Sequence, residues 1–129
     1  MRLLIDTHVL IWWQNADQRL SVGARQLLAD PRADVAISIA SFWEMSIKFR
    51  QGKLQSSGSV AFRNAVEQQF GIVGISDAHL LALEALPERA NHKDPFDRLI
   101  LAQAQIEGRA LMTGDRSMLG YGVPCIGVA

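Results

Sequence analysis

Short aliphatic runs alternate with longer segments of helical periodicity along this chain, and this alternation constrains the fold more than any other feature of the sequence. Five runs have the length and apolar character of buried strands, at residues 2–6, 34–39, 72–75, 109–113 and 123–128. The intervening segments predict helices over residues 8–15, 21–30, 42–51, 59–70, 77–86 and 94–107. Such alternation favours parallel pairing, with helices covering both faces of the sheet. The sequence therefore predicts an α/β fold of three layers, α/β/α, around a central, mainly parallel sheet of four or five strands.

The length and composition fit one globular domain that spans residues 1–129. A chain of this length buries roughly two thirds of its unfolded surface, and 49% of its residues are hydrophobic, with no tract typical of a linker. The longest aliphatic and aromatic run, residues 9–13, is far shorter than the roughly 20 residues of a membrane span, so we expect no membrane contact. The first residues lack the pattern of a signal peptide, and Cys125 is the single cysteine. Both features predict a cytoplasmic protein.

Four acidic residues lie where the predicted strands end. Asp6 ends the first strand and Asp115 follows the fourth. Glu44 lies in the first turn after the second strand, and Asp97 lies in the first turn of the last helix. Ligands of open parallel sheets bind outside the carboxyl ends of the strands, so the four acids can share one site. Converging carboxylates repel one another unless a cation lies among them, and oxygen-only ligation without a zinc-like set of Cys or His predicts Mg²⁺ or Mn²⁺.

Each acid also has a purely structural interpretation. Glu44 completes a Ser-x-x-Glu pattern with Ser41 that is typical of a capping box. Asp97 lies in the first turn of a helix that Asp94 is expected to cap, where the helix dipole favours a carboxylate. Asp6 and Asp115 are of a type that is favoured in turns and as helix caps. The joint occurrence of all four acids, rather than any one of them, indicates a metal site.

Four motifs of this chain resemble those of PIN-domain nucleases and, within that class, of VapC toxins. They are LIDTH (residues 4–8), SxWEMxIK (41–48), HxDPFDRLI (92–100) and MTGD (112–115), in family order over nearly the whole length. The resemblance implies a single PIN domain with a PIN-like fold, whose catalytic and metal-binding quartet is Asp6, Glu44, Asp97 and Asp115. It also implies endonucleolytic hydrolysis of RNA with Mg²⁺ or Mn²⁺, a homodimer, and a VapB-like antitoxin that blocks the acidic site.

Polar residues near these motifs suggest roles in orientation and in RNA binding. Thr7 and Thr113 stand beside acids of the quartet, and their hydroxyls are suited either to orienting a carboxylate or to capping a strand end. Lys48 and Arg98 are interpreted as contacts to RNA, with a solvated helix face or an ion pair as the alternative. His92 belongs to a group of basic residues that flanks the same expected RNA path.

Aromatic residues indicate a surface for a partner. The consecutive apolar residues 9–13 cover every side of their helix, and Trp43 follows another aromatic residue on a later helix. We expect Trp12 and Trp43 to contribute to an apolar groove or dimer face that receives an antitoxin segment. A fully buried helix is the alternative interpretation.

Two other functions stay open at this point. Thirteen basic and thirteen acidic residues give formal neutrality, which argues weakly against binding to nucleic acid, although acids gathered around a cation leave the remaining surface basic. A non-enzymatic module that binds a metal for structural reasons would use the same four acids. A dinuclear metallophosphoesterase shares the pair formed by Asp6 and His8, but no histidine follows His92 to supply its later ligands.

Overall fold

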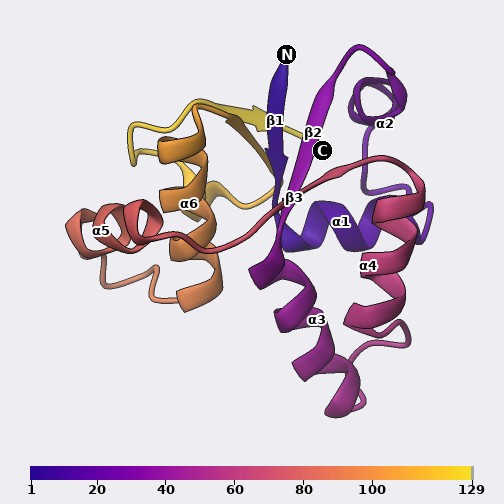
Figure 1. Ribbon diagram of the computed structural model, residues 1–129, viewed down its shortest axis with the longest axis horizontal. Coiled ribbons are helices and arrows are strands. Elements are labelled where there is room, and N and C mark those ends of the chain that lie inside the picture. Colours follow the sequence, from indigo (N-terminus) through magenta and orange to yellow (C-terminus); the bar gives the residue numbers. More distant parts are fainter. Residues whose placement is uncertain (129) are drawn as a thin grey trace.

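The computed structural model describes residues 1–128, which form one five-stranded sheet covered by helices (Figure 1). The strands are β1 (Arg2–Ile5), β2 (Asp34–Ser38), β3 (Gly71–Val73), β4 (Ala110–Thr113) and β5 (Cys125–Gly127). The helices are α1 (Thr7–Gln14), α2 (Val22–Ala29), α3 (Ile39–Arg50), α4 (Gly58–Glu67), α5 (Asp77–Ala85) and α6 (Pro95–Glu107), with a short 3-10 helix η1 (Arg116–Met118). The strand order is β3-β2-β1-β4-β5 and every pairing is parallel, which confirms the predicted sheet.

Alternate side chains of the central strands contribute to two separate cores. In β1, Leu3 and Ile5 belong to one core and Leu4 to the other, and all three are fully buried. The first core contains residues of α1, α2, α3 and α4, and the second contains residues of α5 and α6. Figure 1 shows α5 and α6 on one side of the sheet and α1, α2 and α4 on the other. The three-layer α/β/α arrangement predicted from the sequence is therefore confirmed.

The cap of α3 and the backbone after α4 differ from the boundaries predicted for these helices. The hydroxyl of Ser38 accepts a hydrogen bond from the backbone N–H of Ala40 at 3.0 Å, so α3 begins at Ile39. The prediction that this helix starts at residue 42, opened by Ser41, is therefore wrong, because Ser41 lies inside the helix. Helix α4 ends at residue 67 rather than at residue 70, and Gln69 adopts the left-handed conformation that often follows a helix, with φ of 64°.

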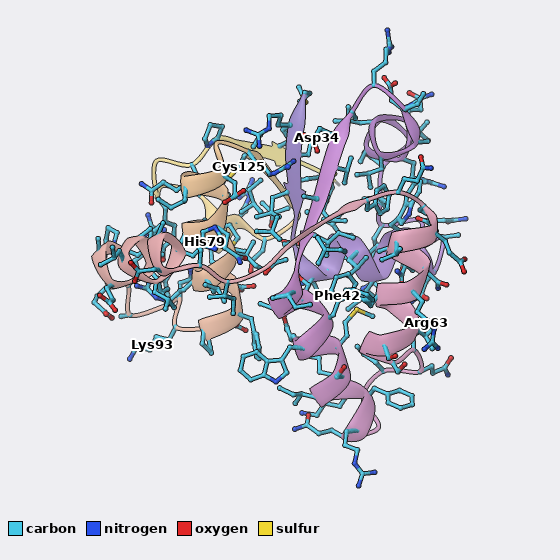
Figure 2. The ribbon with its side chains drawn as sticks, in the orientation of Figure 1. Asp34, Phe42, Arg63, His79, Lys93 and Cys125 are labelled. Carbon is cyan, nitrogen blue, oxygen red and sulfur yellow. The ribbon has the colours of Figure 1, made fainter. Side chains whose placement is uncertain are left out.

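Arg109 joins the amino ends of the three central strands. Its guanidinium donates to the carbonyl oxygens of Leu3 at 3.2 Å and Asp34 at 3.1 Å, and to the carboxylate of Asp34 at 3.0 Å. The hydrogen bond from Arg109 holds the pKa of Asp34 below its ordinary value. Figure 2 shows Asp34 at the start of β2, at the end of the strand away from α3. Because this end of the sheet is held in register, the residues that leave the opposite end are also fixed relative to one another.

The fold leaves part of its apolar helical surface uncovered. Of the apolar run at residues 9–13, the first two residues are fully buried and the other three, including Trp12, are only partly covered. Trp43 on α3 is 58% exposed and makes an edge-to-face contact with Phe96 of α6, with ring centroids 5.1 Å apart. None of the helices formed by residues 1–128 combines the length and the apolar character that crossing a membrane requires.

The space around Gly58 and Gly23 predicts that replacement by alanine changes the stability of the protein in opposite directions at the two positions. A methyl group at Gly58 would collide with the carbonyl oxygen of Phe42 and the hydroxyl of Ser46. Gly58→Ala should therefore lower the free energy of unfolding by about 1–3 kcal/mol, the usual cost of overpacking. Gly23, inside α2, has open space at this position, and Gly23→Ala should raise the free energy of unfolding by about 0.5–1 kcal/mol. Urea unfolding of both variants and the parent measures these changes, and equal stability of the two variants would contradict the packing of α3 against α4.

Candidate metal centre

The strand order brings two carboxylates to the point where the chain changes direction across the sheet. From β1 the chain moves outward to β2 and β3, and then returns to the other side of β1 to form β4 and β5. Because β1 and β4 pair in parallel, their carboxyl ends lie side by side. Asp6 follows β1 directly, and Asp115 follows β4 after one intervening residue. Open α/β sheets bind ligands at such a topological switch point.

Asp6 is buried, and both of its carboxylate oxygens accept hydrogen bonds. Oδ1 caps α1 by accepting from the backbone N–H of Val9 at 2.9 Å, and Oδ2 accepts from the hydroxyl of Thr113 at 2.5 Å. The same hydroxyl accepts from the backbone N–H of Asp115 at 3.0 Å. Burial raises the pKa of Asp6, although these two hydrogen bonds to its carboxylate act in the opposite direction. Thr113 therefore orients Asp6 and joins the two acids that follow β1 and β4.

Glu44 has one carboxylate oxygen in an ion pair and the other without a partner. Oε2 lies 2.9 Å from Nζ of Lys48, one turn further along α3. Oε1 is buried and has no hydrogen-bond partner among residues 1–128. Burying such an oxygen is costly unless it is satisfied, and a bound cation would satisfy it. The predicted capping box is wrong, because Ser38 rather than Ser41 caps α3 and Glu44 contacts Lys48 instead of the backbone.

Asp97 lies in the first turn of α6, close enough to the other acids to feel their charge. As predicted, Asp94 caps this helix, and it accepts from two backbone N–H groups of the first turn at 2.9 and 3.1 Å. Burial raises the pKa of Asp97 to about 6, and the negative charge of Asp94 adds to this increase. A hydrogen bond with His92 opposes the increase, whereas the charges of Asp6 and Glu44 add to it. Acids from three separate segments thus share one electrostatic environment.

Asp115 is half-buried, and its surroundings favour the ionised form. Oδ1 accepts from the backbone N–H of Ser117 at 2.9 Å and from its hydroxyl at 2.7 Å, and so caps η1. Burial opposes ionisation, but these hydrogen bonds outweigh it and hold the pKa of Asp115 below its ordinary value. The charge of Asp115 is also one cause of the raised pKa of Asp6. The acids of the quartet are therefore near one another but have different tendencies to ionise.

A histidine that the sequence did not connect with the quartet lies among these acids. His92 is buried, with Nδ1 2.9 Å from the hydroxyl of Tyr121 and Nε2 3.4 Å from Oδ2 of Asp97. Potential ligand atoms of His92, Asp97 and Asp115 all lie within 4.8 Å of one another. The signal was present in the HxDPFD motif, but the histidine precedes the helix in a loop. Apolar periodicity therefore does not reveal that it contacts Asp97.

Thr7, Arg98 and Lys48 are predicted from the sequence to orient a carboxylate or to bind RNA, and each of them contacts other groups of the protein in this structure. The hydroxyl of Thr7 donates to the hydroxyl of Ser41 at 2.9 Å, which joins α1 to α3 rather than orienting a carboxylate. Arg98 donates to two backbone carbonyl oxygens just after the end of α5, at 3.0 and 3.3 Å. Lys48 is paired with Glu44. In this structure Thr7 and Arg98 hold neighbouring helices together.

The donor atoms at this end of the sheet fit a divalent cation. Carboxylate oxygens are the ligands that Mg²⁺ and Mn²⁺ prefer, and the buried oxygen of Glu44 lacks any other partner in the described part of the chain. Burial raises the pKa values of Asp6 and Asp97, and the charges of neighbouring acids add to this effect, so their ionised forms are disfavoured without a counter-charge. A cation among them would remove that penalty.

Known proteins show the same combination of sequence and fold. The PIN domain family model matches residues 3–122. The chain is 31% identical over 123 residues to Ribonuclease VapC22 of Mycobacterium tuberculosis, across 95% of this chain and 93% of that protein. A toxin-antitoxin complex from Klebsiella pneumoniae contains a chain with 27% identity and a TM-score of 0.67, covering 96% of this chain and 95% of that one.

A structure with lower sequence identity has the same fold. VapBC2 of Rickettsia felis, bound to a DNA fragment from its promoter, contains a chain with 16% identity and a TM-score of 0.79 that covers 100% of both chains. The family match and the identity to the mycobacterial protein agree with the resemblance seen in the four motifs. The chain therefore belongs to the PIN domain family.

Proposed function

We propose that this protein is a metal-dependent endoribonuclease that hydrolyses RNA phosphodiester bonds and serves as the toxin of a toxin-antitoxin pair. The mycobacterial relative is named a ribonuclease, and the similar chain from Klebsiella pneumoniae belongs to a toxin-antitoxin complex. The observation that carries the proposal is the convergence of Asp6, Glu44, Asp97 and Asp115 at one end of the sheet, where their charges act on one another. We further propose that residues 1–129 form a single PIN domain that acts in the cytoplasm.

The four acids are the proposed catalytic and metal-binding residues for Mg²⁺ or Mn²⁺. Asp6, Asp97 and Asp115 would hold the ion directly or through water, and the Glu44 oxygen that has no partner among residues 1–128 would hold a second ion or orient a water molecule. When bound, the cation lowers the pKa of a water molecule and neutralises charge that develops on the phosphate. The hydroxyl of Thr113 keeps the carboxylate of Asp6 in one orientation, so that its geometry is set before substrate arrives.

RNA and an antitoxin are the proposed partners. Lys48 and Arg98 stay predicted RNA contacts, and each would have to share its present hydrogen bonds with a phosphate. The exposed ring of Trp43 supports a binding surface on α3, and Trp12 lines a hollow together with Asp115. We infer that these two tryptophans contact a VapB-like antitoxin or a second copy of this chain in a homodimer.

Removal of one proposed ligand tests the enzymatic function. Asp97→Asn keeps the size of the side chain and removes its charge, so Mg²⁺- or Mn²⁺-dependent cleavage of labelled single-stranded RNA should fall by at least about 100-fold. Asp77→Asn is the matched control, because Asp77 is an exposed acid in the first turn of α5, and it should cleave at the parent's rate.

Two outcomes of this experiment would contradict the proposal. Equal cleavage by Asp97→Asn and the parent, in preparations free of contaminating nuclease, would exclude the catalytic role of Asp97. A parent that binds the metal but cleaves no RNA would instead favour a non-enzymatic metal-binding module.

The opposite pKa shifts of two acids predict opposite changes in stability when no metal is bound. The pKa of Asp97 is raised to about 6, so its ionised form destabilises the fold, and the contribution of Asp97 to the free energy of unfolding should fall as the pH rises from 3.8 through about 6. In chelator at about pH 8, Asp97→Asn should be more stable than the parent by about 1–2 kcal/mol, after allowance for solvent screening. At about pH 4 the two should be nearly equal.

Asp115 should behave in the opposite way. Its lowered pKa means that the ionised carboxylate stabilises the fold above its ordinary pKa, and that this contribution is lost as the pH falls through the lowered value. Asp115→Asn should therefore melt at a lower temperature than the parent at about pH 8 in chelator. Added Mg²⁺ should raise the Tm of the parent more than that of either variant. Shifts of the same sign for Asp97→Asn and Asp115→Asn in chelator would contradict these pKa directions.

A further inference from the structure

We propose that His92 is itself a metal ligand, through Nε2, and that the resulting mixture of nitrogen and oxygen donors makes the site bind Mn²⁺ in preference to Mg²⁺. This inference rests on the proposed metal-dependent function and adds a ligand from outside the acidic quartet. It also revises the expectation from the sequence that oxygen atoms alone hold the ion.

The imidazole of His92 is buried at the acidic site, and its Nε2 faces the carboxylate of Asp97. One ring nitrogen of His92 and one oxygen each of Asp97 and Asp115 all lie within 4.8 Å of one another. The 3.4 Å between Nε2 and Oδ2 of Asp97 exceeds the range of about 2.7–3.2 Å for a normal N–H···O hydrogen bond. Two ligands that are each about 2.1 Å from one ion lie roughly 3.0–3.4 Å apart in octahedral or tetrahedral geometry. The contact is therefore a long hydrogen bond when no ion is present, and its length also fits two ligands of one shared ion.

The other imidazole nitrogen has a partner that orients the ring. Nδ1 of His92 lies 2.9 Å from the hydroxyl oxygen of Tyr121, which is also buried. When Nδ1–H donates to that oxygen, the lone pair of Nε2 is free to bind a metal. The guanidinium of Arg89 packs 4.1 Å from the centre of the Tyr121 ring and donates to the carbonyl oxygen of Leu119 at 2.7 Å, which restrains the tyrosine. Metal-binding histidines usually have such an outer contact.

The other two histidines do not share this geometry, and His8 serves as the control. His8 is exposed and lies beside Trp12, with ring centroids 6.2 Å apart, although its charge reaches Asp6. His79 is buried on α5, and its Nε2 lies 2.9 Å from the carboxylate of Glu107 at the end of α6. Figure 2 shows His79 on the side of the sheet that α5 and α6 cover.

A nitrogen ligand changes which ion the site prefers. Mg²⁺ requires oxygen ligands in near-ideal octahedral geometry and gives up its water reluctantly, whereas divalent first-row transition ions accept imidazole. The imidazole of His92 therefore adds more to the affinity for Mn²⁺ than to the affinity for Mg²⁺. Without it, the remaining carboxylates should discriminate less between the two ions.

Pulsed electron paramagnetic resonance of bound Mn²⁺ tests the inference, because it detects nitrogen coordinated directly to the ion. The protein is labelled with ¹⁵N in its histidines only and mixed with less than one equivalent of Mn²⁺. Coupling to ¹⁵N is expected in the parent and in the control His8→Gln, and it should be lost in His92→Gln. Titrations should show that His92→Gln weakens Mn²⁺ binding by at least about tenfold, with a smaller effect on Mg²⁺.

The possible outcomes separate this inference from the proposed function. Mn²⁺ bound to the parent without nitrogen coupling would overturn the inference, and this measurement does not depend on the folding of any variant. Coupling that survives in His92→Gln and disappears in His8→Gln would also overturn it. Nitrogen coupling in a parent that cleaves no RNA would support the ligand and contradict the ribonuclease. A parent that binds no Mn²⁺ but cleaves RNA with Mg²⁺ would overturn the inference alone, and a parent that binds neither ion would contradict both.

Discussion

The burial of β1 on both faces is the constraint that positions the site. This strand pairs in parallel with β2 on one side and β4 on the other, and Leu3, Leu4 and Ile5 are fully buried between the two helical layers. Asp6 is the first residue after the strand, and its side chain is buried at the carboxyl end of β1. The neighbouring strand β4 runs parallel to β1 and ends at the same side of the sheet, so Asp115, which follows β4, lies near Asp6.

The acids are held close together by bonds that also stabilise the fold. Asp6 caps α1 and Asp115 caps η1, which are the structural roles that the sequence offered as alternatives to metal binding. The two roles are compatible, because a carboxylate has about four lone-pair sites and a backbone cap uses only some of them. The pKa of Asp97 is raised mainly by burial, and repulsion from Asp94, Asp6 and Glu44 adds to the increase. The side chains that cap these helices can therefore also serve the proposed cation site.

The errors made from the sequence concern the ends of two helices and the contacts between segments. The Ser-x-x-Glu pattern of α3 is a sound local signal, but Ser38 starts the helix one turn earlier, and Glu44 faces the acids and Lys48. Thr7 and Thr113 are equivalent by sequence, each next to or near an acid of the quartet, yet only Thr113 donates to a carboxylate. Helical and strand periodicity indicates which face of an element is buried. It does not indicate which other segment the side chains of that element contact.

The order of strands and helices, the parallel class of the sheet, the four acids and their family motifs could all be predicted from the residues, because each is encoded in local spacing or in a short motif. Folding added the pairing of Thr113 with Asp6, which lie 107 residues apart in the chain. It also left an oxygen of Glu44 without a partner in the described part of the chain, and it placed His92 against Asp97. These features arise where the two helical layers meet the edge of the sheet, and the packing of those layers depends on the whole chain rather than on any local pattern.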